Sequence, residues 1–344
     1  MATLQSLLGI ERPVIQAPLA GAQGSALAVA VSGAGGLGSL PCAMLGLEQL
    51  QQELEALRAR TARPYNVNFF CHQPPAPDLA KETAWRARLA GYYEELGIDA
   101  ALIVPAPART PFTAAAAELL EQFKPPVVSF HFGLPAADLL QRLRGWGARL
   151  LGCATTVAEA RWLEARGVDA IVAQGCEAGG HRGMFLSADL STQLGTLALV
   201  RQVVRAVKVP VIAAGGIADA QGVAAAMALG AAGVQVGTAY LLCPEAATSE
   251  VHRSALRSDA ARHTDLTNLF SGRAARGIVN RLMRELGPMS SAVPPFPLAA
   301  AALAPLRAAA ESRGSGDFSP LWAGQNTSGC TRLPAAELTR LLCP

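Results

Sequence analysis

Short apolar runs alternate with amphipathic stretches along the first 240 residues of the chain. The run at 170–174 has the length and β-branched content of a buried strand, whereas 47–60 places four leucines at the three-and-four spacing of a helix. Alternating strands and helices are typical of a parallel sheet. Eight strands are expected in all, at 13–18, 35–40, 65–70, 127–130, 149–153, 170–174, 211–214 and 233–236.

Eight parallel strands separated by helices predict a (β/α)8 barrel, the TIM barrel, rather than an open doubly wound sheet. A length of 344 residues fits such a barrel with additions. Gly33, Gly35 and Gly38 loosely match the dinucleotide-binding pattern GxGxxG. These glycines follow a helix and precede a strand, which is the wrong order for that motif, so the match is set aside.

The pattern divides the chain into a barrel and its additions. Residues 1–240 are expected to form the barrel, interrupted after the third strand by a proline-rich insertion at 71–123. Residues 241–344 contain helical pieces and no series of strands. We therefore expect a helical C-terminal extension that packs over the barrel mouth as one unit with it.

The composition of the chain argues against several classes of partner. Net charge is only +3 and no lysine-rich tail or basic stripe is present, so no nucleic-acid partner is expected. The uncharged run 222–244 is long enough for a membrane span, but its glycines favour a helix, a turn and a strand. Seven scattered cysteines and a start without an export signal indicate a cytoplasmic protein with reduced thiols.

Two glycine turns follow the last two strands, namely Gly215–Gly216 and Gly237–Thr238. Barrels often bind a phosphate with the loops after strands seven and eight, because backbone N–H groups in glycine turns can face phosphate oxygens. Turns of this kind can also simply reverse the chain. Their joint occurrence after both strands favours a phosphate site.

The side chains at the strand ends favour a flavin over a sugar phosphate. Asn66, Asn68, Gln174 and Gln235 are neutral amides, which can both donate hydrogen bonds to the edge of a flavin ring and accept them from it. Glu177 is the single strand-end acid, and no strand-end lysine occurs. A phosphate site combined with these amides predicts flavin mononucleotide (FMN).

The loop after the sixth strand, 174–183, is dense in glycine and carries His181. An imidazole titrates near neutral pH and can take a proton or bind an anion, so His181 is the first candidate for catalysis. His131 is the second candidate, although a structural histidine beneath the site is equally consistent with its position. The remaining histidines, His72, His252 and His263, are read as surface residues, and no metal site is expected because no spaced set of ligands supports one.

Six ordered motifs, at 16–18, 66–70, 128–133, 177–183, 213–217 and 233–238, together resemble the nitronate monooxygenases, especially the bacterial class I group. Segments 270–277 and 322–325 extend the resemblance into the tail. It implies an FMN-containing barrel that oxidises small alkyl nitronates, such as propionate 3-nitronate, with O2 and without a nicotinamide cofactor. The products would be a carbonyl compound and nitrite.

The motifs also assign residues by resemblance. His181 would be catalytic, and His131 and Gln325 would lie near the substrate. FMN would be held by Ala17, Pro18, Asn68, Gln174, Gly179, Gly180, Gly215, Gly216, Gln235, Val236, Gly237 and Thr238.

Two alternatives share these features. An FMN-dependent enoyl reductase would have the same barrel, glycine loop and phosphate turns but would require NAD(P)H. A barrel without catalytic activity would bind only FMN or another phosphate ligand.

Overall fold

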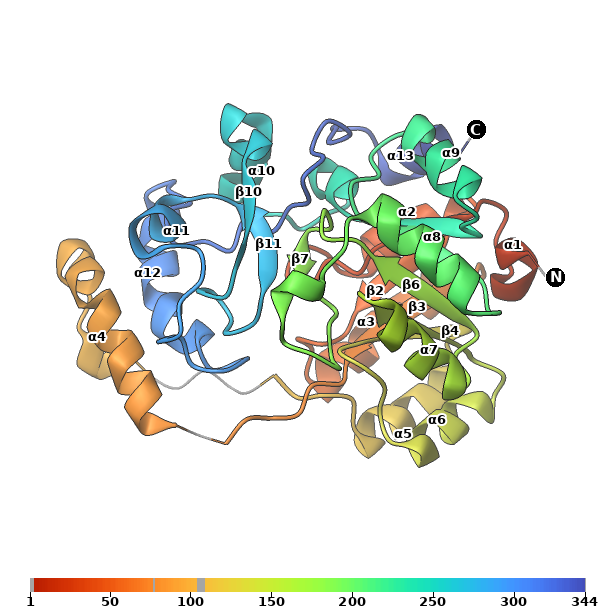
Figure 1. The fold of residues 1–344 in the computed structure, drawn as a ribbon, viewed down its shortest axis with the longest axis horizontal. Coiled ribbons are helices and arrows are strands. Elements are labelled where there is room, and N and C mark those ends of the chain that lie inside the picture. Colours follow the sequence, from red (N-terminus) through yellow and green to blue (C-terminus); the bar gives the residue numbers. More distant parts are fainter. Residues whose placement is uncertain (1–2, 77, 104–108, 344) are drawn as a thin grey trace.

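Eight parallel strands form a closed ring in the structure, a computed structural model that describes residues 3–76, 78–103 and 109–343. Figure 1 shows the arrangement of the strands and helices. A parallel bridge between Ile15 and Leu37 joins the first strand to the chain just before the second and so closes the ring. The (β/α)8 barrel expected from the sequence is confirmed. Its strands follow the order β1 (Val14–Gln16), β9 (Gly233–Val236), β8 (Val211–Ala214), β6 (Ala170–Gln174), β5 (Arg149–Ala154), β4 (Val127–His131), β3 (Tyr65–Phe70) and β2 (Gly38–Pro41).

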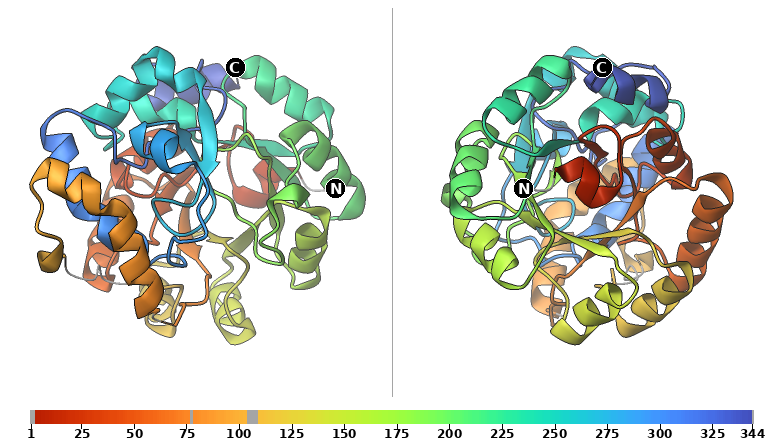
Figure 2. Two further views of the ribbon diagram at one scale, coloured as in Figure 1. Left: turned by 60° about the vertical axis from the view of Figure 1, so that its left-hand side comes forward. Right: turned by 90° about the vertical axis from the view of Figure 1, so that its right-hand side faces the viewer.

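Helices surround the strands, as the view along the barrel shows (Figure 2, right). A short helix, α1 (Leu4–Leu8), closes the amino-terminal end, where Leu4 and Leu8 pack against Ile15 and Ile212 inside the barrel. The loops that follow the strands lie at the opposite end of the barrel, where the strands finish. The ring consists of α2 (Ser25–Gly33), α3 (Leu47–Arg60), α5 (Ala114–Phe123), α6 (Ala137–Arg144), α7 (Val157–Ala165), α8 (Thr196–Ala206) and α9 (Ala220–Ala228), and it is completed by α13 (Ala335–Leu342), which packs against α9 and α2.

The insertion after β3 divides into two parts. Its second part, α5, packs between α3 and α6 and is therefore the ring helix that links β3 to β4. The residues additional to the barrel run from 71 to 113 and carry α4 (Leu79–Leu96) and the short η1 (Ala100–Leu102).

The C-terminal extension contains helices and also a small sheet that the sequence analysis did not anticipate. Strands β10 (Thr264–Thr267) and β11 (Ala275–Ile278) pair antiparallel, and β11 also pairs with β7 (Gly180–His181) in the loop after β6. This sheet lies between the barrel and the outer helices (Figure 1). The helices are η3 (Thr238–Leu242), α10 (Glu250–Arg257), η4 (Asp259–Arg262), α11 (Arg281–Leu286), α12 (Ala300–Ser312) and α13 (Ala335–Leu342). Within the described ranges, none of the helices has the length and apolar character needed to span a bilayer.

Helix α4 and the extension share one hydrophobic core. Trp85 and Leu89 of α4 are fully buried against residues that include Phe270, Leu303 and Phe318. The hydroxyl of Tyr93 donates a 2.7 Å hydrogen bond to the carbonyl of Ala302 in α12. Figure 2 (left) shows α4 lying across the outer face of the extension. The insertion therefore supports the segment that covers the barrel mouth.

We expect Trp85→Ala to destabilise the protein by about 3–5 kcal/mol, because it removes a large buried side chain from this shared core. Leu79→Ala on the same helix is the matched control, since Leu79 is 78% exposed and its truncation should change stability by less than about 0.5 kcal/mol. Chemical denaturation of both variants measures the difference. Equal stabilities would show that α4 does not brace the extension.

Candidate functional site

A cavity of about 290 Å³ lies at the carboxyl ends of the barrel strands, partly covered by the extension. Its walls bring together most of the residues predicted for the cofactor, and His131 and His181 also line it. Two predicted residues are placed elsewhere. Val236 is buried in the barrel wall, and the exposed Gln325 does not line the cavity, whereas its neighbour Asn326 does. The predicted cofactor residues in the walls are Ala17, Pro18, Asn68, Gln174, Gly179, Gly180, Gly215, Gly216, Gln235, Gly237 and Thr238.

The two predicted glycine turns form one side of the cavity. Gly215 and Gly216 have φ angles of +119° and +71°, which side chains rarely allow. Among the described residues, none accepts a hydrogen bond from the backbone N–H of Gly215, Gly216, Gly237 or Thr238. Unpaired N–H groups in adjacent turns suit a phosphate group.

The strand-end amides have different roles. Gln174 is occupied by its own loop, because its Nε2 donates to the carbonyl of His181 (3.0 Å) and its Oε1 accepts from the N–H of Gly183 (2.8 Å). Asn66 is fully buried and donates to two serine hydroxyls below the cavity. Within the described part of the chain, the amide of Gln235 has no protein partner, and Asn68 uses only its Nδ2, which bonds Ser129. These last two amides retain free polar atoms for a ligand.

His181 is held in the wall by the small sheet. Its backbone pairs with Ala275 of β11, and its ring Nε2 lies 2.8 Å from the hydroxyl of Ser271. The rings of Phe296 and Trp322 lie 5.3 and 5.5 Å from the imidazole, centre to centre. Burial, reinforced by nearby cationic side chains such as that of Arg109, holds the pKa of His181 well below 6.5. The imidazole is therefore neutral at physiological pH.

Ser271 controls which ring nitrogen of His181 carries the hydrogen. When its hydroxyl donates to the carbonyl of Arg273 (3.2 Å), its lone pairs accept from Nε2–H. When the hydroxyl rotates to donate to Nε2, the hydrogen moves to Nδ1, for which the described residues provide no partner. Either arrangement keeps one ring nitrogen available to a ligand.

His131 supports the backbone of His181. Its Nε2 lies 3.1 Å from the carbonyl of His181, so that nitrogen carries a hydrogen and donates it. Burial lowers the pKa of His131 to about 3, so the ring is neutral. Of the two readings left open by the sequence, this contact favours a supporting role, although the ring also lines the cavity.

Arg182, which the sequence analysis did not single out, holds the glycine loop from below. Its side chain is fully buried and donates to the carbonyls of Gly175 and Gln174, both at 2.7 Å. Glu177, the strand-end acid, accepts hydrogen bonds from the N–H and hydroxyl of Thr196 and so caps α8. The loop is thus fixed by its charged residues as well as by its glycines.

Gly179 allows the extension to approach this loop closely. A Cβ at this position would lie 2.5 Å from the backbone nitrogen of Gly324 and 2.6 Å from the backbone of Ala323. The same segment donates a hydrogen bond from the N–H of Gly324 to the hydroxyl of Thr238 (2.9 Å). The tail therefore spans the loop after β6 and the turn after β9.

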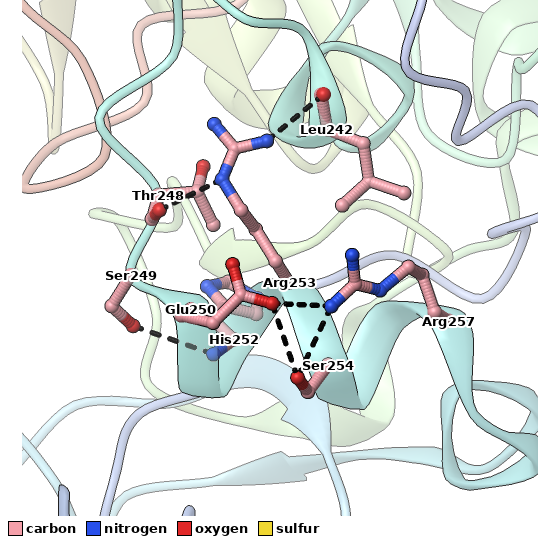
Figure 3. A network of polar contacts seen from close by, with 8 residues as sticks. All are labelled: Leu242, Thr248, Ser249, Glu250, His252, Arg253, Ser254 and Arg257. Atoms are coloured by element: carbon pink, nitrogen blue, oxygen red, sulfur yellow. Dashed lines mark hydrogen bonds and ion pairs between the residues drawn. The ribbon is translucent and has the colours of Figure 1, made fainter. Parts of the chain in front are cut away.

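A second part of the extension, at the start of α10, also lines the cavity. Figure 3 shows the polar contacts around this helix. Arg253 donates to the carbonyls of Leu242, Cys243, Ala246 and Thr248 and so fixes the backbone that leads into the helix. His252, which lines the cavity from this helix, is 8% exposed.

His72, in the insertion, is only 5% exposed. The expectation that His72 and His252 are surface residues is therefore wrong, because the insertion and the extension cover them. His263 is exposed, as expected.

The described lining contains two arginines, Arg109 and Arg307, and no aspartate or glutamate. Such a cavity attracts anions. Across the described residues, no group of three or more histidine, cysteine, aspartate or glutamate side chains is arranged to hold a metal ion.

Sequence and structure relate this chain to known proteins of one family. The family described as nitronate monooxygenase matches residues 2–344. A nitronate monooxygenase of Pseudomonas aeruginosa is 44% identical over 98% of this chain and 96% of its own length, and one of Paraburkholderia phytofirmans is 45% identical over 98% and 93%. The solved structure of a nitroalkane oxidase from Streptomyces ansochromogenes superimposes with a TM-score of 0.90 at 39% identity, covering 99% of this chain and 96% of that one. The chain belongs to the nitronate monooxygenase family.

Proposed function

We propose that the protein binds FMN and oxidises small alkyl nitronates, such as propionate 3-nitronate, with O2 to a carbonyl compound and nitrite, without NAD(P)H. The observation that carries this proposal is the cavity itself. It combines unpaired N–H groups at the last two strand ends with a buried neutral histidine and a lining of cationic and neutral residues. In a member of this family, these features suit a flavin phosphate at one end and an anionic substrate at the other.

The residues present fit FMN. Gly215, Gly216, Gly237 and Thr238 would hold its phosphate through their backbone N–H groups. The free amides of Asn68 and Gln235 would contact the polar edge of the ring, with further contacts from Ala17, Pro18, Gly179 and Gly180, while Gln174 would act mainly by holding the glycine loop. When bound, FMN supplies the acceptor for the electrons of the nitronate and the site at which O2 reacts.

His181 would orient the nitronate. An anion favours the arrangement in which Ser271 donates to Nε2, because Nδ1 then carries the hydrogen and can donate it to a nitronate oxygen. The neighbouring rings of Phe296 and Trp322 exclude water from this hydrogen bond and so strengthen it. His131 acts through the backbone, since it holds the carbonyl of His181 in place.

The first test uses the purified protein under anaerobic conditions. We expect a flavin visible spectrum that propionate 3-nitronate bleaches and that NADH and NADPH leave unchanged. His181→Asn should lower kcat/KM by roughly 10²- to 10⁴-fold, the range for loss of a group that holds or moves a proton at the reacting atoms. His263→Asn is the matched control, since that histidine is exposed.

Each alternative gives a different result in this test. Rapid bleaching by NADPH alone would favour the enoyl reductase. Flavin-containing protein that is inert toward every nitronate would favour a barrel that only binds its ligand. Protein that is colourless and takes up no FMN would contradict all three.

The depressed pKa of His181 predicts a flat pH profile. The neutral imidazole predominates above this lowered pKa, so the charge of the site stays constant there and changes only as the pH falls through that value. We therefore expect kcat/KM, which reports the free enzyme, to change little between about pH 6 and 8. Rapid mixing of pre-formed nitronate at each pH measures this. A loss of activity with a midpoint near pH 6.5 would show that His181 titrates as an ordinary exposed histidine.

A further inference from the structure

Arg109 is a partly buried cation in the cavity wall that has no carboxylate partner in the part of the chain that the structure describes. It lies at the end of the insertion, outside the barrel strands, and lines the cavity. None of the ion pairs among the described residues involves it. Its guanidinium lies 5.4 Å from the centre of the Phe296 ring. Burial lowers the pKa of Arg109, which reflects the cost of keeping this charge away from water.

The other arginines near the site are already engaged. Arg307 forms an ion pair with Glu311 at 2.8 Å. Arg273 lies over the ring of Phe132, at 3.9 Å from its centre, and donates to the carbonyl of Met184. Arg182 donates to two loop carbonyls. Arg109 therefore differs from these neighbours in lacking an oxygen acceptor among the described residues.

The backbone is anchored at Arg109 itself and again on its C-terminal side. His72 lies with Nε2 3.0 Å from the carbonyl of Arg109, so this nitrogen donates to it, and the imidazole packs edge-on against Phe296. Three residues later, the N–H of Phe112 donates to the carbonyl of Phe70 at the end of β3 (2.9 Å). The guanidinium is therefore carried by a fixed segment, which reduces the entropy lost when it binds a ligand.

Arg109 and His181 both lie close to Phe296. Its ring centre is 5.4 Å from the guanidinium carbon and 5.3 Å from the centre of the imidazole, so the separation of the two groups cannot exceed the sum of these distances. Both side chains line the cavity, so a short aliphatic ligand within it can reach toward both. One end of such a ligand would meet His181, and the other would meet a cation.

Resting on the function proposed above, we propose that Arg109 binds a carboxylate at the far end of the nitronate substrate and so selects nitronates that carry a second negative charge. A guanidinium binds a carboxylate through two parallel hydrogen bonds, and this pairing is strong where water is excluded. The described lining contains no aspartate or glutamate that would compete for the guanidinium. A nitronate whose alkyl chain carries no charge would leave this buried cation unpaired.

The test compares two nitronates that differ only at the far end. Propionate 3-nitronate ends in a carboxylate, and propyl 1-nitronate has the same three-carbon chain ending in a methyl group. We expect Arg109→Met to lower kcat/KM for propionate 3-nitronate by roughly 10- to 100-fold, the effect of losing a hydrogen bond to a charged group. The value for propyl 1-nitronate should stay within about threefold, and Arg109→Lys should be intermediate because it keeps the charge without the paired geometry.

Lys81→Met is the matched control, because it removes the same charge from an exposed position of the same insertion. Its ratio of kcat/KM for the two nitronates should equal that of the wild type. A second measurement does not depend on turnover. Calorimetric titration with succinate, an unreactive dicarboxylate, should show binding that Arg109→Met weakens by about tenfold or more and Lys81→Met leaves unchanged.

The outcomes separate this proposal from the proposed function. If both nitronates are oxidised and their ratio is the same in the wild type and Arg109→Met, the role of Arg109 is wrong and the function stands. A parallel loss for both substrates would also overturn it, since Arg109 would then be acting on the structure. If the wild type oxidises neither nitronate, the proposed function fails, and succinate binding alone decides whether Arg109 holds a carboxylate.

Discussion

The pairing of β7 with β11 is the contact on which the site depends most. Two residues of the glycine loop, Gly180 and His181, are bound edge to edge by a strand from a segment nearly a hundred residues later in the chain. Below them, Arg182 donates hydrogen bonds to the carbonyls of Gln174 and Gly175, where the strand turns into the loop. The loop is therefore held from the barrel side and from the extension side at once. This explains how a glycine-rich segment, which would otherwise be mobile, can present one imidazole in a fixed position.

Features that depend on local pattern, unlike this pairing, could be predicted from the sequence. Four strands were predicted with the bounds that the structure has, namely those at 65–70, 170–174, 211–214 and 233–236. Each is a buried and mostly apolar run, so its position follows from the local pattern of the sequence. The cavity-lining glycines and amides followed from those strands, since residues at the carboxyl ends of a barrel must meet at one face. The name of the substrate class came from resemblance and from no physical property of these residues.

Features that depend on contacts distant in sequence were missed. Strand β10 has only four residues, two of them threonine and one aspartate, and its pairing is fixed by β11, which gives no local signal. His72 and His252 look like surface residues in sequence and are buried only because the insertion and the extension fold over them. The role of Arg182 was hidden in the same way, since an arginine is buried only where carbonyls converge on it. Prediction from the sequence was therefore less accurate for residues that are buried by a distant part of the chain.

Burial also links the electrostatic properties of the cavity. Exclusion of water keeps His181 and His131 neutral, and it leaves the charge of Arg109 weakly screened. A neutral imidazole beside the cation of Arg109 avoids the repulsion that two positive charges would create. The cavity wall therefore attracts an anion and is not destabilised by charge repulsion when no ligand is bound. If His181 were protonated, the wall would gain a second charge and bind anions of every kind more tightly, with less distinction between one end of a ligand and the other. On the proposed function, a neutral histidine would leave Arg109 to distinguish a carboxylate from a methyl group, while hydrogen-bond geometry at His181 would orient the nitronate.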